Sequence, residues 1–217
     1  MKRRLGRWAA GLGVITGGVL LVSGLWTDPW MLSYVVVWGF VSLYALMSLD
    51  DDLARERFHP PESSADHIAL HVIRAVALAH LIVGALDTGR LHWTSVPSEL
   101  RLIGLAGMAC SGLLVFRAML SNRFFSAVVR IQKDRGHRVV DGGPYAKVRH
   151  PGYAGMIVVV PMSGLALGSW ISVGFALVYS ALILRRVFFE DAFLQRNLEG
   201  YASYAERVRY RLVPGIF

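Results

Sequence analysis

The sequence predicts an all-α fold, a polytopic transmembrane helix bundle of about six spans. Three observations lead to this prediction. The chain has 217 residues, of which 54% are hydrophobic and only 18% are charged, whereas soluble domains carry about 25% charged residues. The apolar residues gather in runs of about 20, the length that a helix needs to cross a bilayer. The basic residues gather on alternate connections between these runs.

The first two spans are residues 8–26 and 30–49, which contain no charged residue and no histidine. Four basic residues precede the first run, as they would in a signal peptide. This run is longer than the usual apolar core of a signal peptide, and a second run follows it at once. We therefore favour a retained first span.

The later spans contain more interruptions. Residues 67–86 and 100–120 are apolar with one or two polar positions each. Residues 153–187 are long enough for two crossings, which split near Leu167-Gly168-Ser169-Trp170. Because this last run is rich in Gly and Pro, its two helices could instead form a shallow hairpin.

The basic residues indicate the orientation. With six spans and a cytoplasmic N-terminus, the cytoplasmic side holds 19 of the 23 Lys and Arg residues, whereas the outer loops hold only Arg90. This asymmetry follows the positive-inside rule. We expect an integral membrane protein, with a bacterial inner membrane favoured and both termini cytoplasmic. The net charge of +8 then reflects topology and contact with membrane lipids, and no nucleic-acid partner is expected.

We interpret residues 1–217 as one membrane domain, with four spans in residues 1–120 and the functional half in residues 121–217. The connection 121–151 mixes apolar and basic residues, as in a segment that lies at the membrane interface with its arginines toward water. Residues 197–208 predict a further short helix with Tyr201 and Tyr204 on one face.

Several polar residues of the spans have plain structural explanations. Cys110 is expected to be a small packing residue. His67 and His71 have the spacing of a metal pair but lack a third ligand, so no metal site is predicted. Arg74 and His80 are expected to face the bundle or to reach toward the interface.

His150 is the first candidate functional residue. Because Pro151 disfavours the helical region for the residue before it and suits the first turn of a helix, the imidazole is placed at the N-terminal end of the fifth span. Unpaired backbone N–H groups and the positive end of the helix dipole make such a place suitable for anions or polar ligands. A histidine that merely caps the helix is the alternative.

Glu190 and Asp191 are the second candidates, since they follow directly on the last apolar run. Acids are unfavourable at the C-terminal end of a helix, and Arg186 offsets them only in part as an i,i+4 neighbour. Either a ligand or a salt-bridged helix end would explain them.

Two motifs resemble a known family. Gly143-Pro144-Tyr145 and Arg149-His150-Pro151-Gly152-Tyr153-Ala154-Gly155 resemble the signature of the isoprenylcysteine carboxyl methyltransferase family, and some phospholipid N-methyltransferases share a looser form of it. The tail has the order of the family's C-terminal pattern, with Arg186, Glu190, Asp191, Leu194, Tyr201, Tyr204, Val208 and Pro214. The resemblance covers residues 122–214. The family has paired glutamates where this chain has Glu190 and Asp191, so only Glu190 carries over cleanly.

The resemblance implies a membrane methyltransferase with a cytoplasmic site for S-adenosylmethionine. It assigns the cofactor to Tyr145, His150, Pro151, Tyr153, Gly155 and Glu190. Arg149 and Arg186 are our candidates for orienting an anionic acceptor. The acceptor would be a lipophilic small molecule or lipid that carries a carboxylate, amine, thiol or hydroxyl, and the sequence does not define the oligomeric state.

Two other functions stay open on the sequence alone. One is an NADPH-dependent enzyme like the sterol reductases, whose cofactor phosphates would require a cluster of Arg and Lys in the pocket. The other is a non-catalytic membrane protein for assembly or transport. Transport would favour broken spans and acids at mid-membrane, whereas the acids of this chain lie at the edges of its spans.

Overall fold

The computed structural model describes residues 2–48, 51–58 and 67–217, and these ranges contain helices and no strand. The all-α prediction is therefore confirmed for them. The helices are α1 (Lys2–Ser23), α2 (Pro29–Ser48), α3 (Asp51–Phe58), α4 (His67–Leu86), α5 (Ser98–Ser121), α6 (Pro151–Leu167), α7 (Trp170–Asn197) and α8 (Tyr201–Arg207), with short turns η1 (Asp87–Leu91), η2 (Lys133–Arg135) and η3 (Gly143–Ala146).

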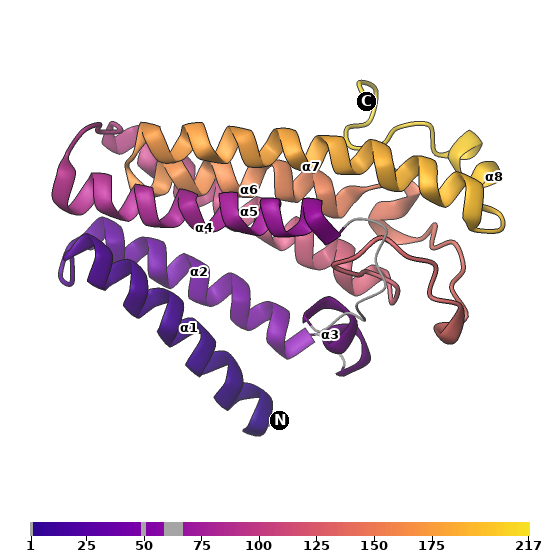
Figure 1. Cartoon of the computed structure of the whole chain (residues 1–217), viewed down its shortest axis with the longest axis horizontal. Helices are drawn as coiled ribbons and strands as arrows, with labels where there is room; N and C mark the ends of the chain where they lie inside the picture. Colours follow the sequence, from indigo (N-terminus) through magenta and orange to yellow (C-terminus); the bar gives the residue numbers. More distant parts are fainter. Residues whose placement is uncertain (1, 49–50, 59–66) are drawn as a thin grey trace.

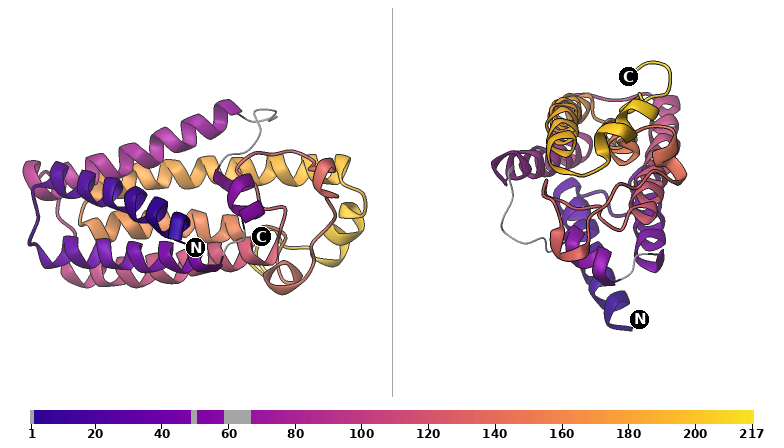
Figure 2. Two further views of the ribbon diagram at one scale, coloured as in Figure 1. Left: turned by 90° about the horizontal axis from the view of Figure 1, so that it is seen from below. Right: turned by 90° about the vertical axis from the view of Figure 1, so that its right-hand side faces the viewer.

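Helices α5, α6 and α7 run side by side along the long axis of the molecule, and α1 diverges from them toward the N-terminus (Figure 1). Helix α4 lies close to α7 near Leu86 and leans away from it toward its His67 end (Figure 2). Helix α8, the C-terminal tail and the connection 122–150 gather at one end of the bundle. Helix α4 therefore packs beside α7 at its Leu86 end and lies farther from α7 at its His67 end.

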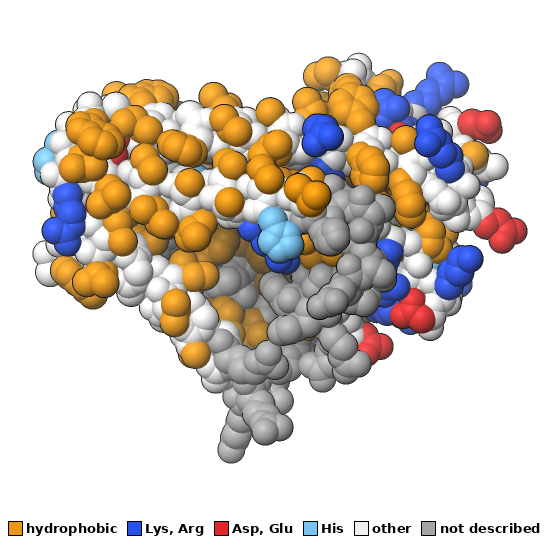
Figure 3. Space-filling model, in the orientation of Figure 1, with side chains coloured by type: hydrophobic (Ala, Val, Ile, Leu, Met, Phe, Trp, Pro, Cys, Tyr) orange, Lys and Arg blue, Asp and Glu red, His pale blue; other side chains and the backbone are white. Residues whose placement is uncertain are grey.

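Four helical segments are long and apolar enough to cross a membrane, namely Pro29–Ser48, Ile68–Leu91, Ser98–Ser121 and Trp170–Asn197. Two further apolar helices, Trp8–Ser23 and Pro151–Leu167, are shorter. All six predicted runs are thus helical, and the number of crossings stays a prediction. Exposed hydrophobic side chains cover the long helices, whereas charged side chains gather at the α8 end (Figure 3).

The turn between α6 and α7 lies where the sequence predicted it. Helix α6 ends at Leu167, and Gly168 takes the left-handed conformation with φ of 94°. The side chain of Ser169 then accepts a hydrogen bond from the Ser172 N–H over 3.1 Å and caps α7.

A buried aspartate closes the opposite end of the bundle from α8. Asp87 accepts hydrogen bonds of 2.5 Å from both the Ser169 and the Thr94 hydroxyl groups, and one of 2.9 Å from the Thr94 N–H. Thr94 in turn accepts a bond from the Trp170 N–H over 3.0 Å. This network ties the α4–α5 connection to the start of α7.

The close packing of α5 and α6 depends on glycines. A Cβ atom on Gly155 would lie 2.8 Å from the Ser111 carbonyl oxygen, and one on Gly104 would lie 2.5 Å from the Ala166 nitrogen. Because backbone atoms cannot yield as side-chain ends do, only glycine allows this approach of the two helices.

Two expectations from the sequence need correction, and a third needs refinement. The connection 121–151 packs into the bundle end, where Phe124 and residues 127–129 are buried, and its position at the membrane interface stays a prediction. The tail helix is shorter than predicted, since α7 continues to Asn197 and Gly200, with φ of 79°, separates it from α8. Cys110 is exposed on α5 and packs no core.

Candidate cofactor site

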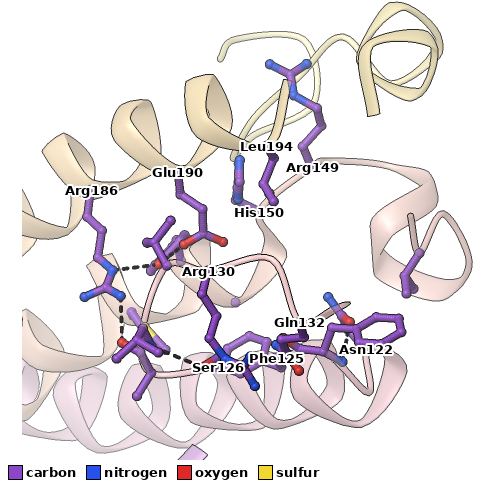
Figure 4. Close-up of a pocket in the computed structure, with 18 of the residues that line it drawn as sticks. Asn122, Phe125, Ser126, Arg130, Gln132, Arg149, His150, Arg186, Glu190 and Leu194 are labelled. Carbon is purple, nitrogen blue, oxygen red and sulfur yellow. Dashed lines mark hydrogen bonds between the residues drawn. The ribbon is translucent and has the colours of Figure 1, made fainter. Parts of the chain in front are cut away.

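A cavity of about 370 Å³ lies at the α8 end of the bundle, within the size range of small-molecule sites. Helices α6 and α7 form one side of it, and the connection 122–140 forms the other. His150 and Glu190 lie on the helical side, and Ser126, Arg130 and Gln132 lie across from them (Figure 4). Helix α4 adds a third, apolar wall.

His150 stands at the N-terminal end of α6, as the sequence predicted. Its backbone has φ of −128° and ψ of 58°, outside the helical region, and Pro151 begins the helix. The tail fixes this turn, because the N–H groups of Arg149 and His150 donate to the carbonyl groups of Tyr210 and Arg211 over 2.9 and 2.8 Å. The imidazole lines the cavity and is buried.

Asp191 organises the side chains behind the cavity. Its carboxylate accepts two hydrogen bonds from Arg149, of 2.8 and 3.0 Å, and one from Arg211 over 3.0 Å. The Tyr201 hydroxyl donates to it over 3.0 Å, and His150 Nε2 lies 3.2 Å from it. Asp191 therefore sets the orientation of the imidazole.

Arg149 is committed to the protein itself. Besides its two bonds to Asp191, its Nη1 donates to the carbonyl groups of Val208 and Arg209 over 2.7 and 2.8 Å. The side chain lines the cavity, and its guanidinium extends toward the tail (Figure 4). This bidentate and buried geometry fixes the tail against the start of α6.

Glu190, one residue before Asp191, faces the cavity. The Tyr153 hydroxyl donates to its Oε2 over 2.5 Å, and Arg186 Nε donates to the same hydroxyl over 2.9 Å. Arg186 also donates to the Ala127 carbonyl over 2.6 Å, which joins α7 to the opposite wall. A half-buried carboxylate held by a phenol at a cavity is suited to bind a cation.

The remaining predicted cofactor residues divide into two groups. Tyr145 lines the cavity, where burial raises its pKa above the usual value, and its carbonyl accepts a bond from Tyr204 over 2.7 Å. Pro151 and Gly155 do not line the cavity. Pro151 starts α6, and Gly155 lies against α5, so both shape the cavity only through the position of the helix.

A second ion pair builds the opposite wall. Arg130 donates to Glu56 of α3 over 3.2 and 2.9 Å, and Ser126 donates to the same carboxylate over 2.7 Å. Burial alone would raise the pKa of Glu56, but the bonds from Arg130 and Ser126 outweigh it and hold this pKa below its usual value. Helix α3 thus anchors the segment that closes the cavity.

Sequence reasoning missed two parts of this site. It gave Asp191 no separate role, because its partners Arg149 and His150 lie 42 and 41 positions away. It also missed Glu56, which is 74 positions from Arg130. Neither pair leaves a local spacing signal. Among the described residues, no group of three His, Cys, Asp or Glu side chains could hold a metal ion.

Comparisons with known proteins find similar sequences and a similar fold. The model of the isoprenylcysteine carboxyl methyltransferase (ICMT) family matches residues 105–196. The protein-S-isoprenylcysteine O-methyltransferase of Schizosaccharomyces pombe is 27% identical over 207 residues, which cover 86% of this chain and 87% of the relative. A probable protein-S-isoprenylcysteine O-methyltransferase of Oryza sativa subsp. indica is 31% identical over 90 residues, or 41% of this chain and 47% of the relative.

A solved structure shares the fold. The eukaryotic intramembrane Ras methyltransferase ICMT superposes with a TM-score of 0.56 and 21% identity, over 96% of this chain and 74% of that one. The family resemblance seen in the two motifs is therefore confirmed. The chain is an ICMT-like membrane methyltransferase, and the match to the family model includes α6, most of α7 and the connection 122–140 that lines the cavity.

Proposed function

We propose that this protein uses S-adenosylmethionine to methylate the carboxylate of a lipophilic acceptor, such as an isoprenylcysteine, within the membrane. One observation supports this most directly: a single cavity joins a polar wall, with His150, Tyr153 and Glu190, to an apolar wall of α4 and α7. The relatives' names specify isoprenylcysteine and an oxygen acceptor. We also propose that the cavity opens to the cytoplasm, since charged side chains gather at this end (Figure 3).

The residues of the cavity fit this cofactor. Its ammonium and sulfonium groups are cations, which suit the Glu190 carboxylate and the rings of Tyr145 and Tyr153. Its methionine carboxylate suits the Arg186 guanidinium or the N-terminal end of α6. NADPH fits less well, because Arg130 and Arg149 are already bound to Glu56 and Asp191. Arg74 and Arg138 lie on separate walls, on α4 and on the connection 122–140, and not in one cluster for its phosphates.

When bound, the cofactor supplies a sulfonium methyl group: an acceptor oxygen bonds to the methyl carbon, the C–S bond breaks with its electron pair on sulfur, and an ester and a thioether result. A carboxylate is already ionised at neutral pH, so the protein needs no general base. Its contribution is to align donor and acceptor, which lowers a barrier by as much as about 7–11 kcal/mol. The walls also exclude water, which favours a step in which opposite charges disappear.

The geometry suggests different roles for the two candidate arginines. The Arg149 guanidinium is bound to Asp191, so we propose that it positions His150 through Asp191. Arg186 holds the Tyr153 hydroxyl that faces Glu190, so it lies within reach of bound ligands.

Titration of S-adenosylmethionine into the purified protein tests the proposal. We expect Glu190→Gln and His150→Gln each to weaken binding by about 10- to 100-fold, the worth of a hydrogen bond to a charged group. Glu199→Gln is the matched control, since Glu199 is exposed and does not line the cavity. Absence of binding by the wild type, or equal binding by all variants, would contradict the proposal.

A further inference from the structure

One wall of the cavity is formed by residues of two candidate membrane spans, Ile68–Leu91 and Trp170–Asn197. On α4 this wall consists of Leu70, Ile73, Arg74 and Ala77, which share one helical face, and on α7 it includes Tyr179 and Ile183. Ile73 and Ile183 belong to one buried cluster with Val115 and Met156, and Tyr153 packs against it. This wall therefore begins directly beside the polar site.

Arg74 is the charged member of this apolar wall. It lies in the candidate span Ile68–Leu91, lines the cavity and is exposed at the molecular surface. Helix α4 leans away from α7 toward this part of its length (Figure 2). Arg74 therefore contacts both the cavity and the molecular surface.

Arg74 differs from two other arginines of the cavity in its contacts, since Arg130 is bound to Glu56 and Arg149 to Asp191. Among the described residues, no acidic group or hydrogen-bond acceptor pairs with the guanidinium of Arg74 or with that of Arg138, which also lines the cavity. Of these two, only Arg74 lies in a candidate membrane span. A cation at membrane depth is unfavourable unless it meets an anion or reaches the interface, so such a residue is a candidate for ligand binding.

We propose that Arg74 binds the carboxylate of the lipophilic acceptor where it enters the cavity between α4 and α7. The apolar side chains beside it would contact the hydrocarbon part, and Arg186, three residues after Ile183, lies farther in toward Glu190. This inference rests on the proposed function. Methylation turns the carboxylate into a neutral ester, which Arg74 cannot hold by charge, so the site favours substrate over product.

The test compares N-acetyl-S-farnesylcysteine with its methyl ester by calorimetric titration in nanodiscs of pure phosphatidylcholine. For the wild type, we expect the carboxylate to bind at least about tenfold more tightly than the ester. Arg74→Gln should abolish this preference and leave the affinities for the ester and for S-adenosylmethionine unchanged, and Arg74→Lys should restore part of it. In turnover, Arg74→Gln should raise the KM for the acceptor and leave kcat nearly constant.

Arg117→Gln is the matched control, because Arg117 is also an exposed arginine of a candidate span but does not line the cavity. An unchanged carboxylate preference in Arg74→Gln, or an equal loss in Arg117→Gln, would overturn the inference. The inference would also be overturned if Arg74→Gln differed from the wild type only in how added phosphatidylglycerol changes its binding of the acceptor. Arg74 would then bind a lipid phosphate. Failure of the wild type to bind S-adenosylmethionine would instead contradict the proposed function.

Discussion

Each end of the bundle contains a buried aspartate, and the two differ in their partners. Asp87 accepts its bonds from the neutral groups of Ser169 and Thr94. Asp191 is surrounded by the cations of Arg149 and Arg211 as well as by Tyr201 and His150. Both carboxylates fix chain segments against α7. Asp191 lies behind the cavity that His150 and Glu190 line, whereas the cavity at the Asp87 end is lined by Thr94 and by no acidic residue.

The contrast shows that two buried carboxylates can have different roles. The hydroxyl groups of Ser169 and Thr94 bond to Asp87 and to backbone N–H groups at the start of α7. These hydrogen bonds therefore hold the start of the helix in place. Around Asp191, two guanidinium groups share one carboxylate, so an excess of positive charge remains near the cavity wall. Burial raises the pKa of Tyr201 above its usual value, so its phenol stays protonated and donates to Asp191. We infer that Asp191 organises a binding site and that Asp87 closes a helical end.

The largest effect is expected when the two aspartates are exchanged for asparagine. Asp191→Asn leaves Arg149 buried without its anion, and breaking a buried ion pair costs about 3–5 kcal/mol. Asp87→Asn weakens hydrogen bonds from neutral donors and leaves no buried cation unpaired, so it should cost about 1–3 kcal/mol. Thermal unfolding in detergent, followed by titration of S-adenosylmethionine below the unfolding temperature, measures both effects.

The binding data distinguish the two roles. We expect folded Asp87→Asn to bind S-adenosylmethionine like the wild type, and Asp191→Asn to bind it weakly. Equal loss of binding in the two variants would show that both ends act only through global stability, and our comparison would then fail.

Much of the fold follows from the sequence because membrane helices leave a strong local signal. Each apolar run became a helix, and Gly168 and Ser169 marked the last turn. The last apolar run was given an end at Val187, and α7 continues ten residues beyond it to Asn197. Apolar length indicates where a helix leaves the hydrocarbon, whereas α7 continues beyond it because Arg149 and Arg211 compensate the charge of Asp191.

The site was predictable only where it follows a motif. His150, Tyr153 and Glu190 were placed by local rules and by the family resemblance, and all three line the cavity. The roles of Asp191 and Glu56 depend on contacts between distant segments, which composition and spacing do not encode. Arg74 was visible as a polar interruption of an apolar run, but its place at the cavity required the packing of α4 against α7.

A smaller effect is expected from the glycines that join α5 and α6. Gly155→Ala would press a methyl group against the Ser111 carbonyl and Val115, and such overpacking costs about 1–3 kcal/mol. Gly104→Ala makes a similar clash with the Ala166 nitrogen nearer the Asp87 end. Both should lower the unfolding temperature, but only Gly155→Ala should also weaken binding of S-adenosylmethionine, because Gly155 sets the position of α6 beside the cavity.

Gly174→Ala is the control for these substitutions, since a Cβ atom there meets nothing within 4 Å. It should be neutral or stabilising by up to about 1 kcal/mol, the usual gain of alanine over glycine in a helix. If Gly174→Ala lost as much stability as Gly155→Ala, the contact between α5 and α6 would not explain the lower unfolding temperature of Gly155→Ala.

The smallest effect is a loss of folding stability at low pH, which should arise at the cavity end of the bundle. His137 lies in the wall of the cavity, where burial and then the charges of Arg130 and Arg135 lower its pKa to about 4. Its Nδ1 accepts a bond from the Gln132 N–H over 3.2 Å, which the protonated ring cannot do. In the unfolded chain the pKa of histidine is about 6.5, so the unfolded state binds more protons below that pH. Stability from this group is therefore complete above about pH 6.5 and is lost as the pH falls toward 4.

His137→Gln removes this titration and keeps a side-chain acceptor for the Gln132 N–H. We expect the unfolding temperature of the wild type to fall more steeply between pH 6.5 and 4 than that of His137→Gln, with the two proteins parallel above pH 7. His92 provides the control at the other end of the bundle, where it is exposed on the α4–α5 connection, so His92→Gln should follow the wild type. Identical acid slopes in all three proteins would show that the cavity wall is no more sensitive to acid than the end closed by Asp87.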